Sequence, residues 1–147
     1  MSFIRIAKIV FIIGLINFSV TNISARETLS SGFDWNPVMD AIVKVESGGD
    51  LKAKNGIYVG AMQIAPIAVK ECNVILQQRG SKKRYTLNDR FSLTKSKEMF
   101  ILIMSKYNPD NNVERAIRIW NGGVRYNHKK TQGYYRKVMS HINKGEI

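Results

Sequence analysis

The sequence has one cysteine, Cys72, and two histidines, His128 and His141, among its 147 residues. A single cysteine excludes an internal disulfide framework and any zinc or iron–sulfur site built from several cysteines. Two histidines leave little room for a histidine-based metal site, so we expect neither a metal nor another cofactor. Because Cys72 has no partner, we expect it to be a buried, inert, small apolar residue.

Acidic residues are also scarce. The chain has 11 Asp and Glu against 23 Lys and Arg, which gives a net charge of +12. Hydrophobic residues at 44% and aromatic residues at 10% argue against a disordered chain. The length suits a single domain. The excess of positive charge predicts affinity for an anionic partner.

The apolar run near the N-terminus, residues 9–20, is shorter than the ~20 residues that a membrane-spanning helix needs. Arg5 and Lys8 precede this run, and the small residues Ser24-Ala25 follow it. That order is typical of a secretory signal peptide. We therefore expect residues 1–25 to be removed and residues 26–147 to form the domain, exported to the periplasm or the extracellular space. An uncleaved membrane anchor is the alternative.

The charge is unevenly distributed along the chain. Residues 26–73 carry a net charge of −1, whereas residues 74–147 carry +11. The densest basic cluster is residues 82–84, followed by residues 129–130 and 136–137. Such clusters usually form a solvated face. No nucleic-acid-binding module is recognisable, so we expect no nucleic-acid partner; cell-wall polymers or membrane surfaces fit an exported protein better.

Helical spacing and capping residues predict an α+β chain that is predominantly α-helical. The first helix is expected from Asn36-Pro37 to the stop at Gly48-Gly49, and later helices over residues 66–76 and 93–107. A small loop and strand region is expected between the first two helices, and a polar basic connector over residues 77–88. Asn111, in capping-box spacing, is expected to begin a fourth helix ending at residues 122–123, and Thr131 to cap a final one.

Glu46 is the candidate for acid–base chemistry. It lies four residues after Ile42 and seven after Met39, so it shares their apolar face at the end of the first helix. Apolar neighbours and the helix C-terminus both disfavour the charged carboxylate, which raises its pKa. Such a group can stay protonated near neutral pH and donate a proton. The alternative is an exposed glutamate in a last turn.

The residues around Glu46 form a series of motifs. In order they are Glu46-Ser47-Gly48-Gly49, a loop through Ala53 and Asn55, Gly60-Ala61-Met62-Gln63-Ile64-Ala65-Pro66, Ala116-Ile117-Arg118-Ile119-Trp120-Asn121-Gly122-Gly123, and Thr131 with Tyr134. This series resembles the catalytic domain of the soluble lytic transglycosylases, relatives of goose-type lysozyme, over about residues 35–140. The resemblance implies a lysozyme-like fold.

The resemblance also implies site residues. Glu46 falls on the family's single catalytic acid/base, and no metal site is implied. Seven residues fall at or beside substrate-contacting positions: Ser47, Asn55, Met62, Gln63, Trp120, Asn121 and Tyr134. The sequence departs from the family pattern in that Asn55 replaces a serine, Trp120 replaces a tyrosine, and the segment from Glu46 to Gln63 is one residue shorter. Met99 and Phe100 stand where many relatives place a cleft tyrosine.

Structural alternatives exist for most of these residues. Met62 is equally consistent with a core position, which is the commoner fate of methionine. Trp120 and Tyr134 are also consistent with packing against the core, and Gln63 with capping the helix that begins at Pro66. Asn55, which precedes a glycine, is first of all a turn residue.

The mechanism that the family implies needs one carboxyl group, whereas glycoside hydrolysis normally uses two. Asp50 is the nearest other acid in sequence, and we expect it to be a solvated loop residue. Three hypotheses therefore stand: a lytic transglycosylase acting on peptidoglycan glycan strands, a hydrolytic lysozyme of the same fold, and a non-catalytic relative with a wall-binding or structural role. Small exported members of this family often serve secretion or conjugation machines, so such an apparatus is a candidate partner. We expect a monomer.

Overall fold

The computed structural model describes residues 32–145, so the predicted signal peptide lies outside the described residues. The elements in chain order are α1 (Asn36–Ser47), β1 (Lys54–Asn55), β2 (Tyr58–Val59), α2 (Pro66–Gln78), the 3-10 helix η2 (Leu87–Phe91), α3 (Leu93–Tyr107), α4 (Val113–Gly122) and α5 (His128–Lys144). The prediction of a mainly helical chain, with a small strand region between its first two helices, is confirmed.

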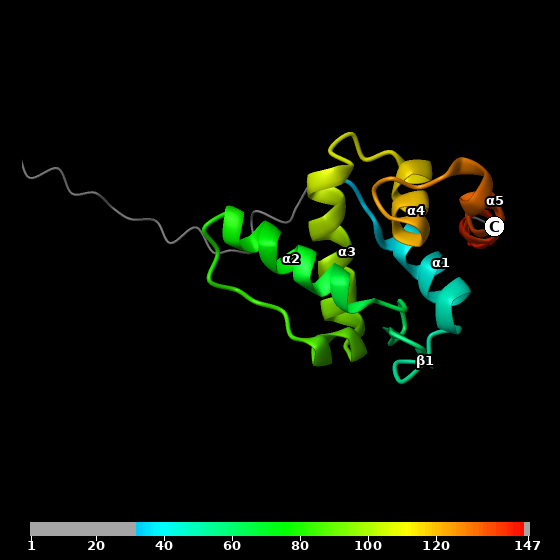
Figure 1. Cartoon of the computed structure of the whole chain (residues 1–147). Helices are drawn as coiled ribbons and strands as arrows, with labels where there is room; N and C mark the ends of the chain where they lie inside the picture. The colour runs from blue at the N-terminus through cyan, green and yellow to red at the C-terminus, as the bar shows by residue number, and fades with distance from the viewer. Residues whose placement is uncertain (1–31, 146–147) are drawn as a thin grey trace, which may run out of the picture.

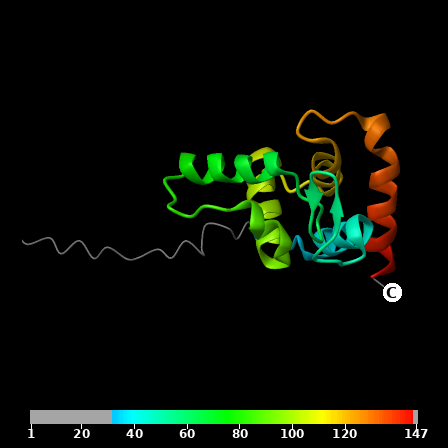
Figure 2. The same ribbon diagram turned by 60° about the horizontal axis from the view of Figure 1, so that its bottom comes forward.

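The helices form two groups (Figure 1). The helices α1, α4 and α5 pack together on one side, and α3 packs on α2 and η2 on the other. The antiparallel pair β1–β2 follows α1, as the second view shows (Figure 2). Fully buried side chains from both groups and from the loop before α2 form one core, among them Ile42, Met62, Phe100, Met104 and Ile117. No helix within residues 32–145 is long and apolar enough to cross a membrane.

The ends of α1 follow from its sequence. Pro37 fits the first turn because its missing N–H would have no helical acceptor there. At the other end Gly48 adopts φ 66°, a left-handed conformation, and its N–H donates to the Lys44 carbonyl at 3.2 Å. The chain therefore leaves the helix directly after Glu46 and Ser47, which places both residues in the last turn.

Two of the predicted helix starts are wrong. The cap of α4 is Asn112, whose side chain accepts a hydrogen bond from the Arg115 N–H at 2.8 Å, while Asn111 lies outside the helix with φ 53°. The cap of α5 is Asn127, so Thr131 lies inside the helix. The Thr131 hydroxyl is buried and donates to the Asn127 carbonyl, which removes it from a capping role.

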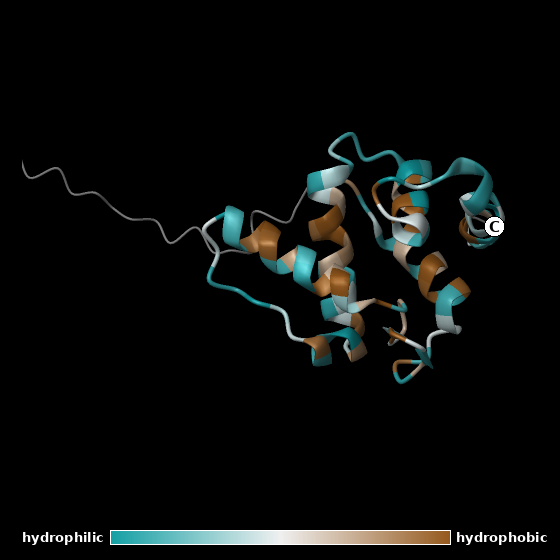
Figure 3. Ribbon diagram, in the orientation of Figure 1, coloured by the Kyte–Doolittle hydropathy of each residue, from teal (hydrophilic) through white to brown (hydrophobic). Residues whose placement is uncertain are grey.

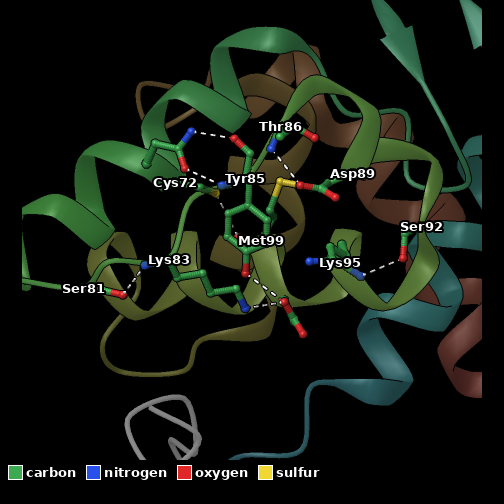
Figure 4. Close-up of polar contacts among 11 residues, drawn as sticks. Cys72, Ser81, Lys83, Tyr85, Thr86, Asp89, Ser92, Lys95 and Met99 are labelled. Atoms are coloured by element: carbon green, nitrogen blue, oxygen red, sulfur yellow. Dashed lines mark hydrogen bonds and ion pairs between the residues drawn. The ribbon is translucent and has the colours of Figure 1, made fainter.

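The predicted connector 77–88 is shorter than expected and is anchored through Tyr85 (Figure 4). The Asn73 side chain donates to the Tyr85 carbonyl and accepts from the Tyr85 N–H, both at 2.8 Å. The buried Tyr85 hydroxyl donates to Glu98 at 3.0 Å. A capping box between Thr86 and Asp89, which the sequence analysis missed, then begins η2.

Candidate active site

Glu46 and Tyr134 meet at the contact between α1 and α5. Glu46 is half-buried in the last turn of α1, beside the buried Met39 and Ile42 of the same helix. The Tyr134 hydroxyl donates to Glu46 Oε1 at 2.7 Å. The two residues are 88 positions apart in sequence. The pairing therefore depends on the packing of the first and last helices.

Burial sets the protonation state of this pair. Loss of solvent raises the pKa of Glu46, and the hydrogen bond from Tyr134 only partly opposes that rise. Burial and the neighbouring Glu46 charge also raise the pKa of Tyr134, so the phenol keeps its proton. The carboxyl group thus favours its acid form more than an exposed glutamate does, as predicted from its apolar neighbours. It is also oriented by a permanent hydrogen-bond donor.

Ser47 connects the end of α1 to the segment that carries Met62 and Gln63. Its hydroxyl donates to the Ala61 carbonyl at 2.9 Å and accepts from the Gly49 N–H at 3.1 Å. Both hydrogen-bonding functions of the hydroxyl are therefore occupied by the protein. Ser47 fixes the position of the loop relative to Glu46.

The loop after β2 is held from its other side by Arg90 of η2. The buried Arg90 guanidinium donates to the Ile64 carbonyl in this loop and to the Ile57 carbonyl just before β2, both at 3.1 Å. Gly60 has φ 76°, and a Cβ there would lie 1.9 Å from the Arg90 carbonyl oxygen, so only glycine fits. Gln63 adopts φ 50°, and its side-chain amide donates to the Gly60 carbonyl at 2.9 Å.

Met62 and Trp120 meet across this loop. The Met62 side chain is fully buried, which is the core position offered as the alternative above. Its backbone carbonyl accepts a hydrogen bond from Trp120 Nε1 at 3.3 Å. The half-buried Trp120 ring also packs on Phe100, with centroids 5.2 Å apart. One side of the Trp120 ring therefore packs against the core, and its other side is left open.

That open side faces a cavity of about 470 Å³ between α2, α3 and the end of α4. Three predicted site residues line it: Gln63, Trp120 and Asn121. Ile103 and Ile119 supply apolar lining, and the exposed Tyr58, Ile67 and Val124 also line it. Glu46 itself does not line this cavity. The segment Ala61–Met62–Gln63 links the two, because Ser47 binds its first carbonyl and Trp120 its second.

Two cavity residues were missed by the sequence analysis. Glu71 of α2 accepts from Tyr107 at 2.5 Å and from Lys106 at 2.8 Å, and Glu71 and Tyr107 both line the cavity. Burial raises the pKa of Glu71, but these hydrogen bonds outweigh it and leave the pKa below its usual value. The available signal was helical spacing, since Tyr107 follows Ile103 by four residues. Spacing alone could not show that α2 and α3 would bring Glu71 to it.

Two exposed residues, Asp50 and Asn55, stand apart from this arrangement. Asn55 is an exposed residue of β1, paired with Tyr58 across the hairpin, and is not among the cavity-lining residues. Asp50 is exposed, and its carboxylate accepts from the Lys52 N–H at 2.8 Å, which is the solvated turn expected for it. The structure thus brings Glu46, Ser47 and Tyr134 together, and Gln63, Trp120 and Asn121 together, but not Asn55.

The arrangement provides one half-buried acid, a neutral hydroxyl donor and an adjoining cavity that combines an indole ring with amide groups. Within residues 32–145, no three His, Cys, Asp or Glu side chains gather as a metal site would require. No family model, no curated protein and no solved structure matches the chain.

Proposed function

We propose that the protein is a peptidoglycan lytic transglycosylase with a lysozyme-like fold and that Glu46 is its single catalytic acid/base. The observation that carries the proposal is the half-buried Glu46, whose pKa is raised by burial and whose carboxyl group is oriented by Tyr134. A general acid needs a pKa near the working pH, and burial is the usual means of raising it.

The reaction balances with Glu46 alone. Glu46 protonates the oxygen between N-acetylmuramic acid and N-acetylglucosamine as the bond from that oxygen to the muramyl anomeric carbon breaks. The muramyl 2-acetamido group stabilises the positive charge that develops on this carbon. The carboxylate then accepts the proton of the same sugar's 6-hydroxyl, whose oxygen bonds to the anomeric carbon. The product has a 1,6-anhydro ring, and no water is consumed.

The adjoining cavity supplies a binding site for the glycan. Trp120 offers an indole face, while Gln63 and Asn121 offer amide groups, a combination that suits sugar rings with hydroxyl and acetamido substituents. The short link through Ala61 and Met62 would keep a glycan held in this cavity in register with Glu46. The exported location and a secretion or conjugation apparatus as partner belong to the same proposal.

The test is digestion of purified peptidoglycan, followed by mass analysis of the released muropeptides. We expect products with anhydro ends, each one water lighter than a lysozyme product. Products with only ordinary reducing ends would instead assign the chain to the hydrolytic lysozymes. No release of muropeptides by the folded protein would leave a wall-binding protein.

The first variant is Glu46→Gln, which has nearly the same shape but can neither donate nor accept the required proton. General acid–base catalysis usually contributes 10²- to 10⁴-fold, and we expect turnover to fall by about that factor. Glycan binding should be retained. The matched control is Glu71→Gln, because Glu71 is the carboxylate that lines the cavity. Equal inactivation by Glu71→Gln would mean that the reaction uses two carboxyl groups.

A further inference from the structure

The outer face of α5 carries exposed charges of one sign only. From Arg115 to Gly145 there is no Asp or Glu. Five exposed cations lie on α5, and none of them forms an ion pair with a residue in the range 32–145: Lys129, Lys130, Arg136, Lys137 and Lys144. We call these five residues the basic face.

The helical period places these cations opposite the buried side of α5. Thr131 and Val138 are buried, one helical repeat of seven residues apart, and point into the molecule. Lys129, Arg136 and Lys144 follow a similar spacing on the opposite side and extend over roughly 22 Å of the helix axis. The exposed Gly133 and Ser140 lie between them on that side, so no large side chain separates the cations.

The basic cluster at residues 82–84 is largely engaged in contacts within the protein. In the predicted cluster 82–84, Lys83 pairs with Glu98 at 2.7 Å, and Arg84 donates to the Ser81 and Lys83 carbonyls. Lys82 is the exposed residue of that cluster with no such contact. The densest cluster of the sequence is thus largely used to fix its own connector, whereas the α5 cluster is presented outward.

Acids on the helices packed against α5 already have other partners. These pairs are Asp40 with Lys97, Glu114 with Arg118, and Glu46 with Tyr134. Asp34 and Asp40 approach α5 beside His141, near its C-terminal end. The positive potential along the basic face is therefore not neutralised by the elements beneath it.

We propose that the basic face binds the surface of a bilayer that contains anionic phospholipids. Figure 2 shows α5 along the outer edge of the molecule, with the other helices on its inner side. A cluster of four to eight Lys and Arg on a helix is sufficient for electrostatic binding to anionic lipids. A planar surface can contact all the cations of a convex helix face together.

The chemistry of the face favours a bilayer over a single-stranded nucleic acid. Single-stranded nucleic acids are typically held in basic grooves lined with aromatic rings. The tyrosines of α5 instead pack inward, Tyr134 against Glu46 and Tyr135 against Arg118. No large hydrophobic side chain of α5 is exposed, so the binding is electrostatic, without insertion into the acyl chains. Figure 3 shows the hydrophilic character of the start of α5 and of the segment before it.

The experiment measures lysine acylation on the full chain, with vesicles of phosphatidylcholine alone or with phosphatidylglycerol added. The lysines of the basic face are compared with Lys52, Lys70 and Lys82, which are exposed on other elements of the same molecule. We expect the anionic vesicles to slow acylation of the α5 lysines selectively, and neutral vesicles to have no such effect. Residue-level labelling separates this contact from any attachment through residues 1–31. Uniform labelling of both sets would overturn the proposal.

A charge-matched pair of variants tests the cause. Lys129→Gln, Arg136→Gln and Lys144→Gln together should abolish the protection of Lys130 and Lys137, because losing three cations weakens binding on the order of 100-fold. Lys52→Gln, Lys70→Gln and Lys82→Gln together remove the same charge and should leave the protection intact.

Equal loss of protection in both triple variants would mean that net charge alone drives binding. Equal or stronger protection by soluble polyphosphate would assign the face to a linear polyanion and overturn the bilayer proposal. Glu46→Gln should bind vesicles normally, so this result does not depend on the proposed activity.

Discussion

At the scale of single residues, the hydrogen bond from Tyr134 to Glu46 tunes the acid. The bond stabilises the carboxylate and so lowers a pKa that burial raises. Tyr134→Phe removes only the hydroxyl, so the pKa of Glu46 should rise further. If Glu46 acts as the general acid, the high-pH limit of activity reports its protonation and should move to higher pH. The measurement is a pH–rate profile of peptidoglycan cleavage.

Tyr135→Phe is the control for this change, since its ring lies against Arg118 rather than Glu46. It should leave the profile in place. A shift to lower pH in Tyr134→Phe would show that the phenol favours the protonated acid instead.

At the scale of structural elements, the loop between β2 and α2 depends on one glycine. Gly60→Ala puts a methyl group against the Arg90 carbonyl, in addition to the cost of φ 76°. We expect a loss of about 2 kcal/mol or more in the free energy of unfolding. Gly56→Ala is the matched control, since its φ is 60° with no atom near the added Cβ, and it should lose about 1 kcal/mol. Urea unfolding measures both, and equal losses would mean that the Arg90 contact imposes no constraint.

Arg118 is the main polar link between α4 and α5. Its buried guanidinium donates to the His128 carbonyl, the Thr131 hydroxyl and the Gln132 side chain, at 3.1, 2.9 and 2.7 Å. Arg118→Met removes the donor that these three acceptors share, and we expect a destabilisation of about 2–3 kcal/mol in urea unfolding. Arg115→Met, at an exposed position of the same helix, should change stability by less than about 0.5 kcal/mol. Similar losses in both variants would contradict the role given to Arg118.

The helices also show how far the sequence predicts this structure. Local signals located the helices, because Pro37, Gly48 and Pro66 act on their own neighbourhoods. They failed at Thr131, whose hydroxyl is taken up by Arg118 and Asn127 inside the helix. They could not show that Gln63 and Trp120 share a cavity with Glu71 and Tyr107, because this depends on how α2, α3 and α4 pack.

At the scale of the whole molecule, the carboxyl groups with shifted pKa values make opposite contributions to the pH dependence of stability. Hydrogen bonds and nearby cations hold the pKa values of Glu71, Asp89 and Glu98 below their usual values. Their stabilisation is therefore present above pH 4.5 and is lost as pH falls through the folded-state values. Glu46 has a raised pKa, so its effect is reversed: stability falls as pH rises from 4.5 through its folded-state value.

We therefore expect stability to decline on acidification below about pH 4.5, with a smaller loss toward neutral pH. Glu46→Gln should remove the loss toward neutral pH and leave the decline at acidic pH unchanged. Chemical unfolding across a pH series measures the loss of stability in both directions. If the loss toward neutral pH persists in Glu46→Gln, it arises from other groups.

The two tryptophans of the chain have different surroundings, so their intrinsic fluorescence reports on two different parts of the protein. Trp35 is buried between Phe33 and Phe100, away from the cavity, and its emission depends on the integrity of the core. Trp120 is half-buried and lines the cavity, so its emission responds to whatever fills that space. With Trp120→Phe, only the reporter of the core remains. Intrinsic fluorescence can thus follow folding and occupancy of the cavity separately, without an added dye.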